Sequence, residues 1–255
     1  MANGFIWYEL MTTDAGAAAS FYAEVVGWTA ADAGGPNAGY TIFSADGRGV
    51  AGAIALPDEA CAAGARPGWI GYVAVPDVDA AVAGVEQAGG SVHKPGFDIA
   101  EVGRAAIVAD PTGATFALLA PRPMGDPPAP LPRMSLGNCG WHELQAGDGE
   151  AAFRFYSGQY GWTEVSTMEM GPMGTYRIWA AGGESVGGMM TRHKQMERPA
   201  WLFYFVVGSV DAAAARIVEA GGTVVNGPME VPDGSWIVQG IDPQGATFAL
   251  VSERR

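Results

Sequence analysis

The pattern of apolar and polar positions changes its period along the first fifty residues. Residues 5–12, "FIWYELMT", are rich in β-favouring side chains and end just before Asp14, a candidate helix N-cap. Apolar residues then follow the i, i+4 spacing of a helix from Ala17 to Val25, and Gly27 ends it. Three short strand candidates follow at 28–32, 40–45 and 49–56. The pattern predicts one βαβββ module.

The same module recurs along the chain. Residues 69–75 lead to Asp77, to a helix that stops at Gly89, and to strand candidates at 91–96, 103–110 and 114–119. In the other half of the chain, residues 141–163 match 7–29 at eleven of 23 positions, and 199–224 match 67–92. "DPTGATFALL" at 110–119 returns as "DPQGATFALV" at 242–251. The sequence therefore predicts an α+β protein made by tandem duplication, with four βαβββ modules.

A proline-rich segment separates the two copies. Residues 121–135 contain six prolines, a density that prevents helix and central strand and favours an extended linker. The predicted domains are 1–120 and 136–255, with 121–135 between them. The repeated "DP.G" is interpreted as a β-turn, in which Asp bonds back to the backbone and Gly takes a positive φ.

Composition and charge narrow the possible partners. The chain is 49% hydrophobic with a formal net charge of −13, which disfavours nucleic acid, and it has no apolar run long enough to span a membrane. The first residues do not read as a secretion signal. Cys61 and Cys139 lie at positions that do not correspond between the copies, so we expect free, buried thiols. The expected protein is cytoplasmic, binds a small molecule rather than nucleic acid or membrane, and is a monomer or homodimer.

The order of the motifs resembles a known superfamily. Four βαβββ modules, with "D…FY…GW" after the first strand and "DP.GATF" before the last, are similar to the vicinal oxygen chelate superfamily. That superfamily includes glyoxalase I, bleomycin resistance proteins and extradiol dioxygenases. The resemblance implies two cups of β-sheet, each made by two modules. It also implies a divalent metal in each enzymatic cup, held by His, Gln or Glu from first strands and by a carboxylate from the last strand.

This chain departs from the family pattern at the metal ligands. The family's spacing places the six ligand positions at residues that cannot bind a metal: Trp7, Ile70, Ala117, Trp141, Leu202 and Ala249. No cofactor is therefore expected, and a divalent metal is the less favoured alternative. The histidines, His93, His142 and His193, are interpreted as surface or hydrogen-bonded groups.

Alternation along the first strands suggests what replaces the metal. Trp7, Glu9 and Met11 share one face of their strand, and Trp141, Glu143 and Gln145 share the matching face. The first hypothesis is a metal-free protein that binds a small, partly aromatic or conjugated molecule in the cups. The predicted ligand-binding residues are Trp7, Met11, Ile70, Tyr72, Ala117, Trp141, Gln145, Leu202, Tyr204 and Ala249. Packing of the same rings as core is the competing interpretation.

Two other functions stay open at this point. In an enzyme of lyase, isomerase or dioxygenase type, Glu9 or Glu143 would be the general base, with structural pairing of each Glu as the competing interpretation. A protein–protein module would use the methionines of the second copy, from Met168 to Met196, as an adaptable surface. The sequence does not phase Tyr40 or Tyr176 on their strands, and it does not say which cup is functional.

Overall fold

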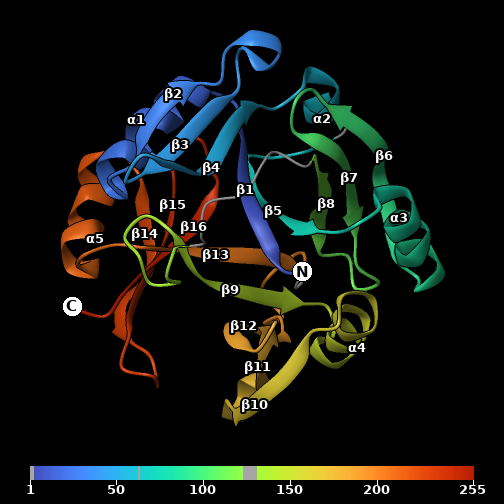
Figure 1. Ribbon diagram of the computed structural model, residues 1–255. Helices are drawn as coiled ribbons and strands as arrows, with labels where there is room; N and C mark the ends of the chain where they lie inside the picture. Colours follow the sequence, from blue (N-terminus) through green and yellow to red (C-terminus); the bar gives the residue numbers. More distant parts are fainter. Residues whose placement is uncertain (1–2, 63, 123–130) are drawn as a thin grey trace. The chain divides into compact units, whose positions relative to one another are not determined.

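The computed structural model describes residues 3–62, 64–122 and 131–255, and it contains the four predicted modules in order (Figure 1). The first module consists of β1 (Phe5–Thr12), α1 (Ala15–Val25), β2 (Thr29–Asp32), β3 (Thr41–Ala45) and β4 (Arg48–Ala55). The second consists of β5 (Gly68–Ala74), α3 (Val78–Gln87), β6 (Ser91–Ile99), β7 (Gly103–Ala109) and β8 (Thr115–Pro121).

The second copy repeats this arrangement. The third module consists of β9 (Cys139–Ala146), α4 (Gly149–Tyr160), β10 (Thr163–Glu169), β11 (Thr175–Ala181) and β12 (Glu184–Thr191). The fourth consists of β13 (Ala200–Val206), α5 (Val210–Glu219), β14 (Thr223–Glu230), β15 (Trp236–Ile241) and β16 (Thr247–Ser252). Three short elements were not predicted: α2 (Asp58–Ala62) and the 3₁₀ turns η1 (Gly35–Asn37) and η2 (Gly171–Met173).

The strands form two eight-stranded sheets, one in each copy. Their orders are β2-β3-β4-β1-β5-β8-β7-β6 and β10-β11-β12-β9-β13-β16-β15-β14, so the two copies have the same topology. The α+β prediction is confirmed. The predicted linker, 121–135, falls mostly outside the described residues.

Contacts divide the chain differently from the sheets. One compact unit contains the described residues of 1–7, 70–128 and 142–201, and the other contains those of 8–69, 129–141 and 202–255. The first unit therefore holds most of the second and third modules, and the second unit holds most of the first and fourth.

The helix of each module begins at a capping side chain. The carboxylates of Asp14, Asp77 and Asp148 accept hydrogen bonds from the backbone N–H three residues later, at 2.9, 3.0 and 2.9 Å. Ser209 does the same at 3.2 Å. These bonds satisfy donors that the first helical turn leaves unpaired, so the N-cap prediction for Asp14 is confirmed.

The two "DP.G" segments are β-turns, as predicted. The N–H of Gly113 donates to the carbonyl of Asp110 at 2.9 Å, and Gly113 has φ +97°, a value that L side chains rarely adopt. One carboxylate oxygen of Asp110 accepts from the N–H groups of Thr112 and Ala114, at 2.7 and 3.1 Å. The turn at Asp242 has the same bonds.

The second carboxylate oxygen of each turn makes a contact that the sequence did not reveal. In the first unit, the Tyr156 hydroxyl donates to Asp110 Oδ2 at 3.2 Å and accepts from Trp201 Nε1 at 3.1 Å. Asp110 is 2% exposed and Tyr156 is fully buried, so this chain of bonds lies inside the protein. It ties helix α4 of one module to the turn before β8 of another.

The second unit contains the same chain of bonds. The Tyr22 hydroxyl donates to Asp242 Oδ2 at 3.1 Å and accepts from Trp69 Nε1 at 2.9 Å. Burial raises the pKa of the Tyr22 hydroxyl well above its ordinary value, and the nearby Asp242 raises it further. The tyrosine therefore stays protonated and serves as the donor.

Replacing Tyr22 or Tyr156 with Phe should lower the free energy of unfolding by about 1–3 kcal/mol, because a buried carboxylate oxygen and a buried indole N–H lose their partner. Ser20→Ala, which removes an exposed hydroxyl from the same helix as Tyr22, is the control and should stay within about 0.5 kcal/mol. Denaturant unfolding measures both. Equal losses in Tyr22→Phe and the control would contradict this role.

The buried Asp242 should also make stability depend on pH. Burial raises the pKa of its carboxyl above the ordinary 3.8, against hydrogen bonds that lower it. Because the folded protein binds this proton more tightly than the unfolded chain does, the protonated Asp242 carboxyl stabilises the fold. This contribution is complete below the unfolded pKa and is lost as pH rises through the folded pKa. Relative to Asp242→Asn, which stays neutral, the free energy of unfolding of the wild type should fall as pH rises above the unfolded carboxyl pKa of about 3.9 and through the raised folded pKa. A difference that is constant or rises with pH would contradict this.

Candidate functional site

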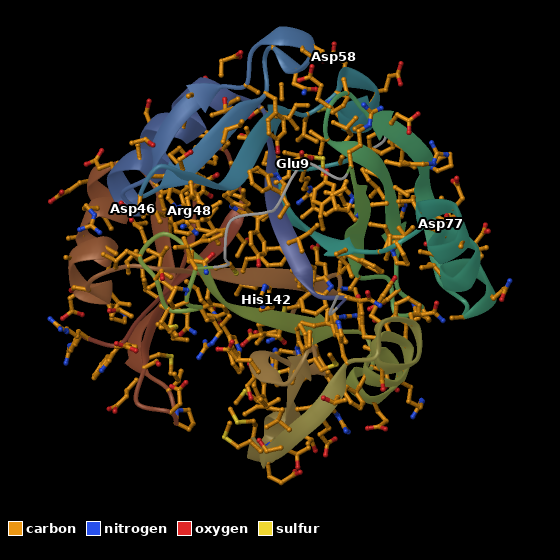
Figure 2. All side chains as sticks on the ribbon, in the orientation of Figure 1. Glu9, Asp46, Arg48, Asp58, Asp77 and His142 are labelled. Carbon is orange, nitrogen blue, oxygen red and sulfur yellow. The ribbon has the colours of Figure 1, made fainter. Side chains whose placement is uncertain are left out.

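The first strand of each copy has one buried and one half-exposed face. On β9, His142, Leu144 and Ala146 are buried, whereas Glu143 and Gln145 are partly exposed. On β1, Leu10 and Thr12 are fully buried, whereas Glu9 and Met11 are partly exposed. Glu9 lies on the half-exposed face of β1, and His142 lies on the buried face of β9. Figure 2 labels both side chains. The two glutamates are the carboxylates that the strands leave accessible.

Glu143 is the centre of a small polar group in the first unit. Gln145 Nε2 donates to Glu143 Oε1 at 2.9 Å, and the Tyr176 hydroxyl donates to Glu143 Oε2 at 3.3 Å. All three side chains are half-exposed. Gln145 lies on the same face of β9 as Glu143, and the two hydrogen bonds orient the Glu143 carboxylate from both of its oxygens.

A glycine opposite Glu143 makes room for Tyr176. Gly188 on β12 is the register partner of Glu143, and a Cβ built on Gly188 would lie about 2.0 Å from the Tyr176 ring. Tyr176 therefore crosses β12 directly over Gly188 to reach the carboxylate. Any larger residue at 188 would collide with the ring.

The second unit has the same arrangement around Glu9. Gly52 on β4 is the register partner of Glu9, and a Cβ at Gly52 would lie 2.2 Å from the Tyr40 hydroxyl oxygen. Glu, Tyr and Gly thus recur together in both copies. Sequence reasoning missed Tyr40 and Tyr176. A glycine inside each strand opposite the glutamate was the available signal, because such glycines mark close approach of another group.

Several predicted ligand-binding residues come together in one apolar cluster of the second unit. Tyr204 and Ala249 are buried register partners on β13 and β16, and the half-buried Trp141 and Leu202 pack against them with Met134 and Ile237. The Tyr204 hydroxyl accepts from Gln239 Nε2 at 2.7 Å, and Gln239 Oε1 accepts from Asn226 at 3.3 Å. The Arg133 guanidinium lies 5.8 Å from the centre of the Trp141 ring.

The remaining predicted residues differ in their burial. Ile70, Tyr72 and Ala117 are 3%, 4% and 0% exposed, and Tyr72 and Ala117 are register partners on β5 and β8. Trp7 and Met11 are half-exposed. A ligand can reach Trp7, Met11 and the glutamates as they stand, whereas contact with Tyr72 or Ala117 would require side chains to move.

The histidines have ordinary structural partners. His142 is 6% exposed, its Nδ1 lies 2.6 Å from the Val186 carbonyl, and its ring stacks on Phe5 at 4.9 Å. His93 Nε2 lies 3.5 Å from the Thr115 hydroxyl, and His193 Nδ1 accepts from the Gln195 N–H at 3.3 Å.

Both cysteines are free, as expected, but only one is buried. Cys139 is 5% exposed, and burial raises the pKa of its thiol to about 12, so it is unreactive at neutral pH. Cys61 lies in the short helix α2 and is exposed, which makes the expectation of burial wrong for this residue. Its lack of a counterpart in the other copy is explained by its place outside the repeated strands and helices.

The donor set does not fit a resident divalent metal. Within residues 3–62, 64–122 and 131–255, no three His, Cys, Asp or Glu side chains lie close enough together to hold one. The family's ligand positions carry indole, alkyl and methyl groups, and Glu143 is surrounded by an amide and a phenol. Protein sites for such metals use three or more good donors.

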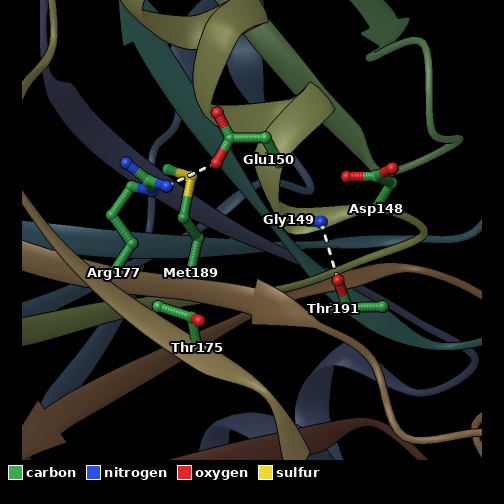
Figure 3. Close-up of a pocket in the computed structure, with 7 residues that line it drawn as sticks. All are labelled: Asp148, Gly149, Glu150, Thr175, Arg177, Met189 and Thr191. Atoms are coloured by element: carbon green, nitrogen blue, oxygen red, sulfur yellow. Dashed lines mark hydrogen bonds and ion pairs between the residues drawn. The ribbon is translucent and has the colours of Figure 1, made fainter. Parts of the chain in front are cut away.

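Two hollows in the described part of the chain are lined by neither Glu9 nor Glu143. The first, of about 180 Å³, lies between the start of α4 and strands β11 and β12, where Arg177 pairs with Glu150 and the Gly149 N–H donates to Thr191 Oγ1 at 3.0 Å (Figure 3). The second, of about 270 Å³, is lined in part by Asn3, Asp77 and Tyr160. Arg177 also pairs with Glu164, so its charge is already neutralised by the protein. Both hollows are smaller than a drug-sized ligand needs.

Comparison with known proteins identifies the family. The model of the Glyoxalase/Bleomycin resistance protein/Dioxygenase superfamily matches residues 4–118 and 138–250. The chain is 37% identical over 248 residues to CFP32 of Mycobacterium tuberculosis, provisionally named a glyoxylase, covering 96% of this chain and 93% of that one. It is 36% identical over 262 residues to the anthracycline biosynthesis protein DnrV of Streptomyces peucetius, with 97% and 92% covered.

Solved structures share the fold at low identity. The Mn(II)-bound glyoxalase from Novosphingobium aromaticivorans has a TM-score of 0.66 at 18% identity, covering 99% of this chain and 82% of that one. A trihydroxybiphenyl dioxygenase from Sphingomonas wittichii has a TM-score of 0.68 at 15% identity, with 98% and 90% covered. The fold and the family match define a tandem glyoxalase-fold protein. The chain belongs to the Glyoxalase/Bleomycin resistance protein/Dioxygenase superfamily, and the resemblance inferred from its motifs is confirmed.

Gly188→Ala should displace Tyr176 from Glu143, because the added methyl group would overlap the ring. We expect a loss of about 1–3 kcal/mol in the free energy of unfolding from overpacking. Gly158→Ala is the control, since a Cβ there meets nothing within 4 Å and alanine favours helix α4. Denaturant unfolding of both variants tests this. A Gly188→Ala protein as stable as Gly158→Ala would show that Tyr176 does not lie over residue 188.

Proposed function

We propose that this protein binds a small, partly aromatic or conjugated molecule against the half-exposed faces of its first strands, without a metal. The observation that carries the proposal is the Glu143, Gln145 and Tyr176 group, a half-exposed, hydrogen-bonded set of polar side chains from β9 and β11. A few placed polar groups among apolar walls are typical of ligand sites. Glu9 with Tyr40 and Gly52 provides a related face in the first copy.

Two further features support an aromatic ligand. Trp141, Leu202 and Ile237 are half-buried apolar side chains around Tyr204, and Trp7 is half-exposed on β1. Aromatic rings provide large flat contacts for conjugated molecules. The relative DnrV is named for anthracycline biosynthesis, and anthracyclines are polycyclic aromatic compounds. We also propose that the other predicted ligand-binding residues contribute to the site and that the protein is cytoplasmic. Those residues are Met11, Ile70, Tyr72, Ala117 and Ala249.

The enzymatic alternative is less well supported. A general base takes a proton from its substrate, whereas both oxygens of Glu143 already accept hydrogen bonds from Gln145 and Tyr176. Glu143 therefore suits holding a ligand better than taking a proton from one. The protein–protein alternative is weakened because Met189 and Met190 are only 1% and 8% exposed and cannot contribute to a surface. Met173, which is 49% exposed, still could.

Binding can be tested with an anthracycline and with 2-hydroxyanthraquinone as probes. We expect saturable quenching of tryptophan fluorescence by both, matched by heat release in calorimetry, and binding weakened by roughly tenfold in Trp141→Ala. Elemental analysis of untagged protein should find no stoichiometric metal, and added Mn²⁺ or EDTA should leave the affinities unchanged. Absence of binding across a broad aromatic panel, or a strict requirement for metal, would overturn the proposal.

A further inference from the structure

The environment of Glu143 favours one kind of ligand group. We infer that the wall formed by Glu143, Gln145 and Tyr176 selects ligands that present a hydroxyl donor. The inference rests on the proposed function, since it describes which aromatic molecules the protein prefers.

The first step is the direction of the hydrogen bonds. An ionised carboxylate only accepts hydrogen bonds, and Glu143 receives one from Gln145 and one from Tyr176. Because Gln145 turns Nε2 toward Glu143, its amide oxygen is on the opposite side of the side chain. Because Tyr176 directs its hydroxyl hydrogen at the carboxylate, the phenolic oxygen offers lone pairs elsewhere. The group therefore presents mainly oxygen acceptors.

The second step is the cost of a mismatched ligand. All three side chains are half-exposed, so a bound ligand would displace water from them. A ligand hydroxyl replaces that water with a charge-assisted hydrogen bond, whereas an ether or ketone oxygen at the same place faces the carboxylate with lone pairs. Desolvating acceptors without providing a donor is unfavourable.

The third step is the fixed position of the acceptors. Tyr176 crosses β12 over Gly188, and Gln145 lies two residues from Glu143 on the same face of β9. The packed ring and the strand hold the carboxylate from two sides. A preorganised group of this kind discriminates between ligands better than a mobile one does.

The first copy differs at the position that matters. Met11 occupies on β1 the place that Gln145 occupies on β9, and its register partner is the apolar Ile54. Glu9 therefore lies beside a thioether where Glu143 lies beside an amide. Of these two aligned positions, Gln145 carries an amide oxygen and Met11 does not.

The test compares 2-hydroxyanthraquinone with 2-methoxyanthraquinone, which differ only by the methyl group on one oxygen. At pH 6, where the phenol is protonated, the hydroxyl compound should bind the wild-type protein about tenfold more tightly or better, by fluorescence and calorimetry. Glu143→Gln and Gln145→Met should each reduce that preference to about threefold or less. Glu86→Gln, which makes the same change at an exposed glutamate of helix α3, is the matched control and should leave the preference within about twofold.

Each outcome decides between the two proposals. If both compounds bind the wild type equally, the proposed function stands and the donor selectivity is overturned. If Glu143→Gln and Gln145→Met keep the preference, or if Glu86→Gln removes it, this inference is wrong. If neither compound nor an anthracycline binds, both proposals fail. Circular dichroism and thermal unfolding check that each variant is folded.

Discussion

A buried hydrogen-bonded chain from Trp to Tyr to Asp occurs once in each compact unit, and the positions of the strands depend on it. One oxygen of Asp110 or Asp242 closes the turn before the last strand of its module. The other accepts from a tyrosine on the helix of a different module. A carboxylate removed from water is costly unless its lone pairs are used, and here both oxygens are used. Turn, helix and strand are thereby fixed by one side chain.

This arrangement shows which parts of the structure are readable from sequence. The turn at Asp110 and the caps at Asp14 and Asp77 depend on bonds to residues within four positions, so the local pattern predicts them. The bond from Tyr22 to Asp242 joins residues 220 positions apart. The local sequence does not show whether one or both carboxylate oxygens of a turn aspartate accept hydrogen bonds. The interpretation of Asp242 as a turn residue was therefore correct but did not include its bond to Tyr22.

The candidate site was predictable to the same degree. Alternation along β1 and β9 separates Glu9 and Glu143 from their buried neighbours, because both strands are regular. Tyr40 and Tyr176 could not be phased because the strand register shifts a few residues after each, between Phe43 and Ser44 in one copy and between Trp179 and Ala180 in the other. A bulge breaks the period of two on which the prediction depends. Alternation also cannot tell a lining residue from a packed one, as the buried Tyr72 and Ala117 show.

The two copies illustrate how a duplicated scaffold separates structure from recognition. The Trp–Tyr–Asp chains are the same in both units, because losing one of these tyrosines would leave a buried carboxylate oxygen and an indole N–H without a hydrogen-bond partner. The strand faces carry no such constraint, so Gln145 stands in one copy where Met11 stands in the other. Both copies keep a glycine under a tyrosine beside a glutamate, which the fold alone does not require. A site that recognises ligands by hydrogen bonds rather than by metal coordination needs only such small changes to alter its specificity, since one amide oxygen changes which ligand groups are satisfied.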